Sequence, residues 1–254
     1  MKSEEMKITE LFDTSHTLAA ELFEGKTYAW EVLEDLSHFI EELGPKLPQD
    51  EYQQVRPGVW IHKTARLVPN VVVGSRAIIG PRVEVRPGAF IRGRVIIGAD
   101  CVIGNSCELK NAILFDGVQV PHFNYVGDSI LGTKSHLGAG AVTSNVKSDK
   151  TLVKVHAEDG DIETGLKKLG AIVGDGVEVG CNSVLNPGTV IGKNSIVYPL
   201  SSVRGCVPAN SIYKGKDEIV VREEQAPEKK APAKRTRAKK SEKAESGKGL
   251  KVVK

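Results

Sequence analysis

Histidines are the first candidates for proton transfer in this sequence, because an unperturbed imidazole changes its charge near neutral pH. His122 differs from the other five in its setting: it follows Pro121 in the segment PHFNYVGDS, with Asn124 and Tyr125 beside it. The others fall in a predicted helical segment, at regular repeat positions or in a long loop: His16, His38, His62, His136 and His156. His122 is therefore a candidate general base, although a lone loop histidine is more often structural.

The elements that must position these residues follow from a six-residue repeat. Every sixth residue is apolar in two stretches: Leu67, Val73, Ile79, Val85, Ile91, Ile97, Ile103, Leu109 and Phe115, then Val173, Val179, Leu185, Ile191, Val197 and Val203. Neither a helical period of 3.6 nor strand alternation keeps this phase. Short strands separated by corners do keep it. The repeat predicts an all-β solenoid, a parallel β-helix whose column residues point inward and whose coils bury their faces by stacking.

The repeat is interrupted twice. It loses phase over residues 121–128 and resumes with Leu131 and Leu137. A second interruption, the long loop at residues 146–171, has no six-residue character, and its segments 152–156 and 161–164 around Asp159-Gly160 are typical of a hairpin. Loops that project from a rigid scaffold often carry function, so we expect the chemistry of the chain at these interruptions.

A helical segment, residues 1–50, precedes the solenoid domain, residues 51–220. Helices are predicted over residues 17–23 and 27–43, each followed by a glycine. Since the end coil of a solenoid has no neighbour, we expect these helices to form a hairpin that caps the first coil. A contact between subunits and a docking site for a partner are the alternatives.

Charge is distributed unevenly along the chain. Residues 227–254 hold eleven Lys or Arg and three Glu, a net charge of +8, so the rest of the chain carries about −5 of the total of +3. The C-terminal residues 221–254 are predicted to form a disordered basic tail, which either contacts polyanions weakly or only aids solubility.

Composition also limits location and cofactors. The sequence has no apolar run long enough for a membrane span and no signal peptide at its start. Its four cysteines show no CxxC spacing, which argues against zinc and favours the reducing cytoplasm. We expect a cytoplasmic protein that requires no metal.

Four motifs in order carry a resemblance. They are Arg86-Pro-Gly-Ala, Glu108-Leu-Lys110, His122-Phe-Asn-Tyr125-Val-Gly-Asp128 and Gly138-Ala-Gly-Ala-Val-Thr-Ser-Asn145. Over about residues 60–216 the sequence resembles the acetyltransferase domain of bifunctional sugar-1-phosphate nucleotidylyltransferase/glucosamine-1-phosphate N-acetyltransferases. The segment after Asn145 is similar to the archaeal type. The resemblance implies a left-handed winding and an acetyl-CoA-dependent transfer to the amine of glucosamine-1-phosphate or galactosamine-1-phosphate, within amino-sugar nucleotide and cell-envelope precursor metabolism.

The resemblance also implies roles for individual residues. His122 would be the catalytic base. The Gly138-Ala139-Gly140 turn or the Tyr125 hydroxyl would stabilise the oxyanion. Six residues match substrate-binding positions, with Lys150 one residue out of step: Arg86, Lys110, Tyr125, Asn145, Lys150 and Lys154. Five match positions that contact acetyl-CoA, which in the family lies between the subunits of a homotrimer: Ala139, Cys181, Pro199, Lys214 and Lys216.

Departures from the family pattern leave alternatives. The first 60 residues are too short for a nucleotidylyltransferase half, so a separate nucleotidylyltransferase is one candidate partner that the sequence leaves open. The domain could instead acylate another nucleotide-linked amino sugar, or serve as a scaffold without catalysis. A zinc carbonic anhydrase of the same fold is disfavoured, because His122 and His136 are fourteen residues apart.

Overall fold

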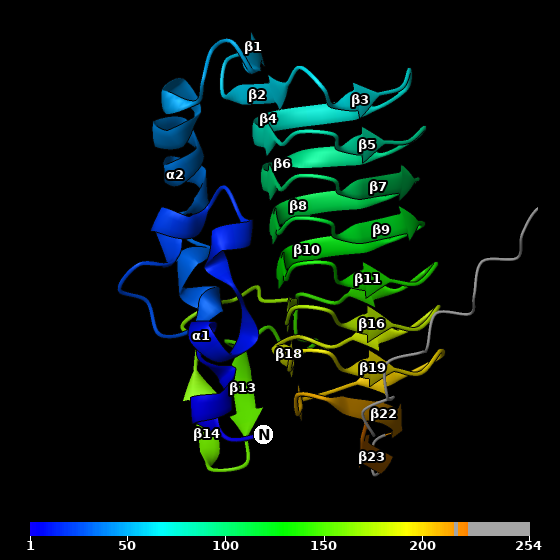
Figure 1. The fold of residues 1–254 in the computed structure, drawn as a ribbon. Coiled ribbons are helices and arrows are strands. Elements are labelled where there is room, and N and C mark those ends of the chain that lie inside the picture. The colour runs from blue at the N-terminus through cyan, green and yellow to red at the C-terminus, as the bar shows by residue number, and fades with distance from the viewer. Residues whose placement is uncertain (216–217, 223–254) are drawn as a thin grey trace, which may run out of the picture. The chain divides into compact units, whose positions relative to one another are not determined.

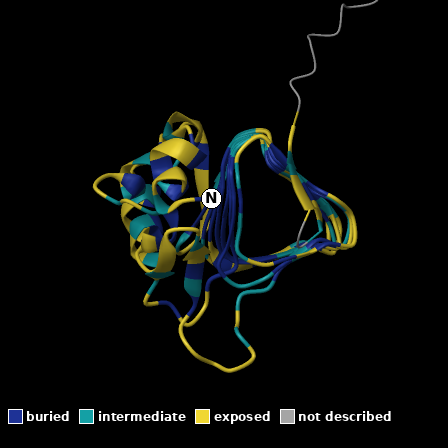
Figure 2. Ribbon diagram, turned by 90° about the horizontal axis from the view of Figure 1, so that it is seen from below, coloured by how far each residue is buried: buried dark blue, intermediate teal, exposed yellow. Residues whose placement is uncertain are grey.

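A β-solenoid forms most of the chain, as predicted (Figure 1). The computed structural model describes residues 1–215 and 218–222, and residues 1–222 form one compact unit. In the end view of Figure 2 the coils superpose as a triangle, so the solenoid has three faces and three edges. The left-handed sense of winding stays a prediction of the resemblance.

Parallel strands stacked from coil to coil make the three faces. Four long strands bend at one edge and so belong to both the first and the second face: β4 (Val72–Ile79), β6 (Phe90–Ile97), β8 (Glu108–Leu114) and β10 (Tyr125–Leu131). The first face continues with β12 (Val142–Thr143), β17 (Val184–Leu185) and β20 (Ser202–Val203). The second face also holds β2 (Val59–His62), β15 (Ala171–Val173), β18 (Thr189–Ile191) and β21 (Cys206–Val207).

The third face is a separate sheet. Its parallel strands are β3 (Arg66–Leu67), β5 (Glu84–Val85), β7 (Val102–Asn105), β9 (Gln119–His122), β11 (His136–Leu137), β16 (Glu178–Val179), β19 (Ile196–Val197) and β22 (Ser211–Gly215). Antiparallel partners cover the two ends of the stack: β1 (Tyr52–Arg56) pairs with β2, and β23 (Glu218–Val221) pairs with β22. Such partners satisfy backbone groups that an end strand would leave open.

The predicted inward column is correct except at Phe115. Leu114, not Phe115, pairs with Ile97 above and Leu131 below. The step from Leu109 to Leu114 is one residue short because the edge between the first and second faces loses a residue there. The step from Val126 to Leu131 is short for the same reason. One residue is therefore lost at the corner of residues 110–111, before the predicted interruption, and another at the corner of residues 127–128, within it.

An outward row of branched side chains on the second face is buried. Each member precedes an inward column residue, and each is fully buried: Ile78, Ile96, Ile113, Ile130, Ile172 and Val190. Residues 1–46 cover this row, and Figure 2 shows this segment against a single side of the triangle. Phe115 points into the same layer, where its ring lies 5.1 Å from that of Phe12 and 5.7 Å from that of Phe23.

The helical segment differs from the prediction in length and in position. It consists of short helices: η1 (Ser3–Met6), α1 (Ile8–Leu11), η2 (Thr14–His16), η3 (Ala20–Phe23), η4 (Ala29–Val32), α2 (Leu36–Leu43) and η5 (Gly44–Lys46). The predicted helix over residues 27–43 is thus interrupted between η4 and α2. The segment lies along the side of the solenoid and does not cap its first coil, because the apolar row that it covers extends down the second face.

The long loop contains the expected hairpin, β13 (Lys154–Ala157) paired with β14 (Gly160–Glu163). Its two ends meet, because the N–H of Leu169 donates to the carbonyl of Asn145 at 3.1 Å and that of Gly170 to Asp128 at 2.8 Å. The loop therefore leaves and rejoins the solenoid at the edge between the first and second faces. Residues 223–254 of the predicted tail, and Lys216, lie outside the described residues. Among the described helices, none has the length and apolar character needed to cross a membrane.

Replacing Phe115 by alanine should detach the helical segment. The ring is fully buried between the solenoid and two other phenylalanines, and such a truncation costs about 3–5 kcal/mol of unfolding free energy. Urea denaturation and the rate of proteolytic cleavage within residues 1–46 measure the effect. Phe123→Ala is the matched control, since Phe123 is 62% exposed. Equal losses for both variants would contradict the packing described here.

Candidate active site

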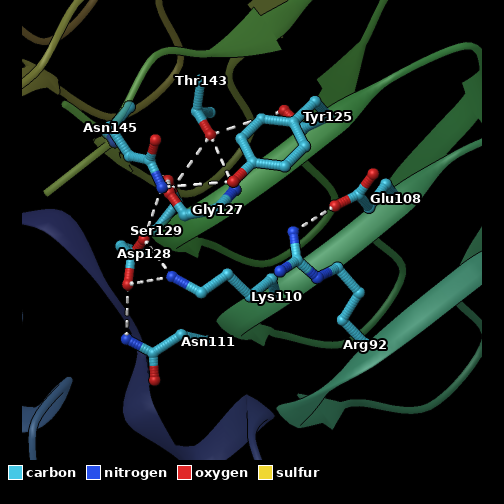
Figure 3. A network of polar contacts seen from close by, with 11 residues as sticks. Arg92, Glu108, Lys110, Asn111, Tyr125, Gly127, Asp128, Ser129, Thr143 and Asn145 are labelled. Atoms are coloured by element: carbon cyan, nitrogen blue, oxygen red, sulfur yellow. Dashed lines mark hydrogen bonds and ion pairs between the residues drawn. The ribbon is translucent and has the colours of Figure 1, made fainter. Parts of the chain in front are cut away.

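The first face lies between two edges that carry most of the predicted site residues. The edge toward the third face, here called the His122 edge, is formed by residues 86–88, 104–106, 121–123, 138–140, 180–182 and 198–200. The edge toward the second face, called the Lys110 edge, is formed by residues 74–76, 92–94, 110–111 and 127–128. Figure 3 shows the polar groups at the Lys110 edge.

His122 ends β9 and is exposed, and its imidazole has no hydrogen bond or ion pair within residues 1–215 and 218–222. Its backbone is held firmly: the N–H donates to the Asn124 side chain at 3.1 Å, and the carbonyl accepts from Gly140 at 3.0 Å. The ring is therefore free to take a proton from a ligand, on a backbone fixed by its neighbours.

Asn124 connects His122 to the turn in the next coil. Its side chain is 2% exposed and donates to the carbonyls of Gly138 and Ala141, at 2.8 and 3.0 Å. Between these residues, the N–H of Ala139 has no hydrogen-bond partner within the described part of the chain. A backbone donor that the fold leaves unpaired can bind an anionic oxygen.

Asp128 gathers the polar groups of the Lys110 edge (Figure 3). Its side chain is 5% exposed and accepts from the Lys110 ammonium at 2.9 and 3.2 Å and from the Asn111 amide at 2.9 Å. The Asn145 amide donates to the same carboxylate. A buried carboxylate of this kind is tolerated because a cation and several donors compensate its lost hydration.

Tyr125 lies on the outer side of the first face with its hydroxyl next to Asn145. The Asn145 amide donates to this hydroxyl at 3.2 Å, so the phenolic proton remains available to a ligand. A side chain at Gly127 would collide with the ring, since a Cβ there would lie 2.4 Å from the hydroxyl oxygen. Burial raises the pKa of Tyr125, and the nearby Asp128 adds to the shift. The phenol is therefore a neutral donor at physiological pH.

Three of the predicted substrate residues are thus brought together: Lys110, Tyr125 and Asn145. Arg86 is not with them, because it lies on the His122 edge and pairs with Glu84 at 2.8 Å. Lys154 pairs with Glu163 inside the β13–β14 hairpin, at 2.6 Å. Lys150 is exposed in the loop, without a contact to the Asp128 cluster among the described residues.

The structure supplies residues that the sequence interpretation did not assign. Arg92 takes the place expected for Arg86: it stands beside Lys110 in the row above, and its guanidinium bonds Glu108 at 2.7 Å (Figure 3). Asp128 and Asn111 complete the cluster. The spacing in the sequence could have indicated Asn111 and Asp128. Together with Arg94 they recur every 17 residues, which is the length of one coil here. All three have a positive φ, which non-glycine residues adopt mainly at tight corners.

The predicted acetyl-CoA residues follow one another down the His122 edge. Asn182 donates to the carbonyl of Ala139, and Leu200 donates to that of Cys181, at 2.8 and 2.9 Å. Pro199 is next in this row. Lys214 lies nearby on β22 and pairs with Glu218 at 3.0 Å. His122 and His136, the pair considered for zinc, do not face one site. The His136 imidazole lies on the third face, where it bonds Glu178 at 2.8 Å.

A ligand that touches both edges must lie across the first face. Gly127, the residue that pairs with Lys110, is the fifth residue after His122, which corresponds to at most about 16 Å of strand. The Lys110 ammonium stays at its own edge, where the Asp128 carboxylate holds it at 2.9 Å. Tyr125 lies between the two edges.

Comparison with known proteins identifies relatives of the solenoid. Residues 76–197 match the family model described as the GMPPB C-terminal domain. The "Bifunctional protein GlmU" of Methanococcus maripaludis is 34% identical over 114 residues, 45% of this chain and 28% of that protein. A "Bifunctional sugar-1-phosphate nucleotidylyltransferase/acetyltransferase" of Sulfurisphaera tokodaii is 35% identical over 107 residues, 42% of this chain and 27% of that protein. The chain thus matches less than a third of the length of these relatives.

Solved structures that overlap with the chain include the acetyltransferase domain of PglB from Neisseria gonorrhoeae in complex with acetyl coenzyme A. That domain is 12% identical, with a TM-score of 0.28 and coverage of 78% of this chain and 80% of that one. A putative acetyltransferase from Bacillus cereus is 15% identical, with a TM-score of 0.39 and coverage of 64% and 76%. From the sequence matches, the chain holds a hexapeptide-repeat, acetyltransferase-like β-helix domain that resembles the C-terminal part of the bifunctional relatives.

Asp128→Asn should destabilise the protein, because an amide cannot accept from Lys110, Asn111 and Asn145 together. Removing one member of a buried ion pair costs about 3–5 kcal/mol, to be measured as the loss of unfolding free energy in urea. Asp100→Asn is a close control: Asp100 also has a positive φ, but its pair with Arg82 is exposed. We expect a loss of at most about 1 kcal/mol for the control. An equally small loss for Asp128→Asn would disprove the central role of this carboxylate.

Proposed function

We propose that this chain is an acetyl-CoA-dependent N-acetyltransferase acting on an amino-sugar 1-phosphate, either glucosamine-1-phosphate or galactosamine-1-phosphate. The observation that carries the proposal is the pairing of two free groups at one edge: the His122 imidazole and, one coil away, the unpaired N–H of Ala139. A proton acceptor beside an oxyanion donor is the minimum that acyl transfer to an amine requires.

In the proposed reaction the amine of the sugar attacks the thioester carbonyl of acetyl-CoA and a C–N bond forms. The proton that the nitrogen loses passes to the His122 imidazole. The carbonyl oxygen becomes an oxyanion, which the Ala139 N–H stabilises. Collapse of the tetrahedral intermediate breaks the C–S bond, and the departing thiolate takes the proton from His122. Asn124 acts as a positioning residue, because it bonds both the His122 backbone and the turn around Ala139.

The Lys110 edge would hold the sugar phosphate. Lys110 and Arg92 supply positive charge on the outer side of the first face, and the Tyr125 hydroxyl supplies a neutral donor. Arginine and lysine are suited to phosphate, the first by its forked geometry and the second as a point charge. Binding across the first face would place the amine on the side of His122.

Acetyl-CoA would lie along the His122 edge, past Ala139, Cys181 and Pro199 toward Lys214. Large apolar side chains are exposed along this edge and on the adjoining first face: Val72, Phe90, Phe123 and Leu200. Exposed apolar surface of this kind favours a contact between copies of the chain. We therefore propose a homotrimer that covers the first face, working in the cytoplasm alongside a separate nucleotidylyltransferase.

Release of the CoA thiol by the purified chain tests the function. The wild-type protein, given acetyl-CoA with glucosamine-1-phosphate or galactosamine-1-phosphate, should release thiol in step with N-acetylated product. His122→Ala should lower kcat by about 10²-fold or more, since a general base contributes a factor of this size. His136→Ala is the control, because its imidazole bonds Glu178 on another face. A rate in His122→Ala equal to that of the wild type would exclude His122 as the base. An inactive wild-type protein would favour a scaffold.

A further inference from the structure

The strand β1 forms the open edge of the twelve-stranded sheet, at the end of the stack that Figure 1 shows uppermost. Its only strand partner among the described residues is β2. After Tyr52 every residue of β1 is exposed, so the strand lacks a buried face. Such a strand is held mainly by its hydrogen bonds, and its free edge can add a further strand. Residues 52–56 also lie outside the matched residues 76–197, so this edge is not part of the family match.

The register of β1 determines which of its backbone groups face outward. The Lys63 N–H donates to the Glu51 carbonyl at 2.8 Å, so Glu51 bonds toward β2. Bonding alternates along an antiparallel pair, so Tyr52 and Gln54, one and three residues further on, face away from β2. The Tyr52 N–H bonds the Pro48 carbonyl at 2.8 Å. The N–H and carbonyl of Gln54 are left without a partner within the part of the chain that the structure describes.

A pocket of about 410 Å³ adjoins the same edge. Leu47, Tyr52 and Trp60 form its apolar wall, and Gln53 and Gln54 of β1 line it as well. An added strand bonds through its main chain and places alternate side chains in pockets beside the edge. The unpaired edge and the adjoining pocket are therefore the two features that an added strand requires.

The chain itself carries a strand that fits this edge, namely β1 of a second copy. Antiparallel pairing about a two-fold axis at Gln54 places each Gln54 opposite the same residue of the other copy. In that register Gln53 lies opposite the partner's Val55, and Tyr52 lies opposite the partner's Arg56. The backbone groups of Gln54 that face outward then bond their own counterparts.

Side chains along β1 complement one another in this register. Val55 is 48% exposed, and pairing brings it beside Gln53 at the pocket of the other copy. The Arg56 guanidinium donates to the Gly74 carbonyl at 3.0 Å but has no carboxylate partner within residues 1–215 and 218–222. Pairing brings it next to the partner's Glu51. Because the strand is acidic at its start, neutral at its centre and basic at its end, it complements itself when it is reversed.

We propose that β1 is an interaction surface through which two copies of this chain pair edge to edge. The Gln54 N–H of each copy donates to the Gln54 carbonyl of the other, and the second face continues from one solenoid into the next. The contact leaves the first face untouched. It is therefore independent of the proposed function, and it can form between single chains or between trimers.

Sedimentation equilibrium of the full chain tests the pairing with two variants that act differently. Gln54→Lys places two ammonium groups opposite each other at the two-fold axis, where like charges repel. Gln54→Pro removes the outward N–H and leaves the bonds to β2 intact, because proline is tolerated at strand edges. Gln119→Lys is the matched control: Gln119 is also an exposed strand residue, but its strand β9 is paired on both sides.

We expect the wild type and Gln119→Lys to have twice the particle mass of either Gln54 variant, whether the smaller species is a single chain or a trimer. Protein concentrations up to about 1 mM reveal even an association with a Kd of about 100 µM. Circular dichroism spectra equal to that of the wild type show that the variants are folded.

Two results would overturn the pairing: a wild-type protein with the mass of the Gln54 variants, or folded Gln54 variants that keep the doubled mass. The first result would also follow if the edge accepts a strand of another protein instead of a second copy. Thiol release separates this proposal from the acetyltransferase, since the Gln54 variants should keep the wild-type rate. A wild-type protein of doubled mass that transfers no acetyl group would refute only the acetyltransferase.

Discussion

Hydrogen bonds between consecutive coils govern the whole molecule, because each coil satisfies its backbone N–H and C=O groups only through the coils above and below it. This stacking places residues one coil apart in the same position on the triangle. It is the reason that Lys110, Gly127 and Arg92, far apart in the sequence, occupy adjacent rows. It also fixes the backbone of His122 against Gly140 and so holds the Ala139 amide beside it. The stacking of the coils thus brings the residues of the candidate site together, and their relative positions depend on the register between neighbouring coils.

The sequence predicts the solenoid well, because a six-residue column of inward side chains reports directly on that register. It fails at Phe115, where one residue is lost from an edge. Leu114 and Phe115 are both apolar, so a count of six selects the wrong member of the pair, and only the pairing with Ile97 reveals it. The covered second face could have been predicted too. Its outward row is branched and apolar from Ile78 to Val190, whereas the outward residues of the third face include Glu84, Gln119 and Glu178.

The site was predicted in part for a related reason. Motif order places Lys110, Tyr125 and Asn145 in the right neighbourhood, and the structure brings them together. It does not reveal at which corner of the triangle a given residue lies, so Arg86 was assigned to a cluster from which a whole face separates it. The lysines of the long loop also lie in two separate places. Lys150 and Lys154 leave with the loop, while Lys167 and Lys168 return to the edge where the loop ends.

The meeting of Asn145 with Leu169 and Gly170 has a consequence for how such a protein can change over evolution. The two ends of the loop meet at a corner, so the loop does not interrupt the stacking of the coils. The strand β10 pairs in parallel with β12, before the loop, and with β15, after it. The length and composition of the loop between those ends therefore do not affect how the coils stack. New side chains can be supplied to the rim of the Asp128 cluster at no cost to the register of the scaffold, so ligand preference and fold can vary independently at this one place.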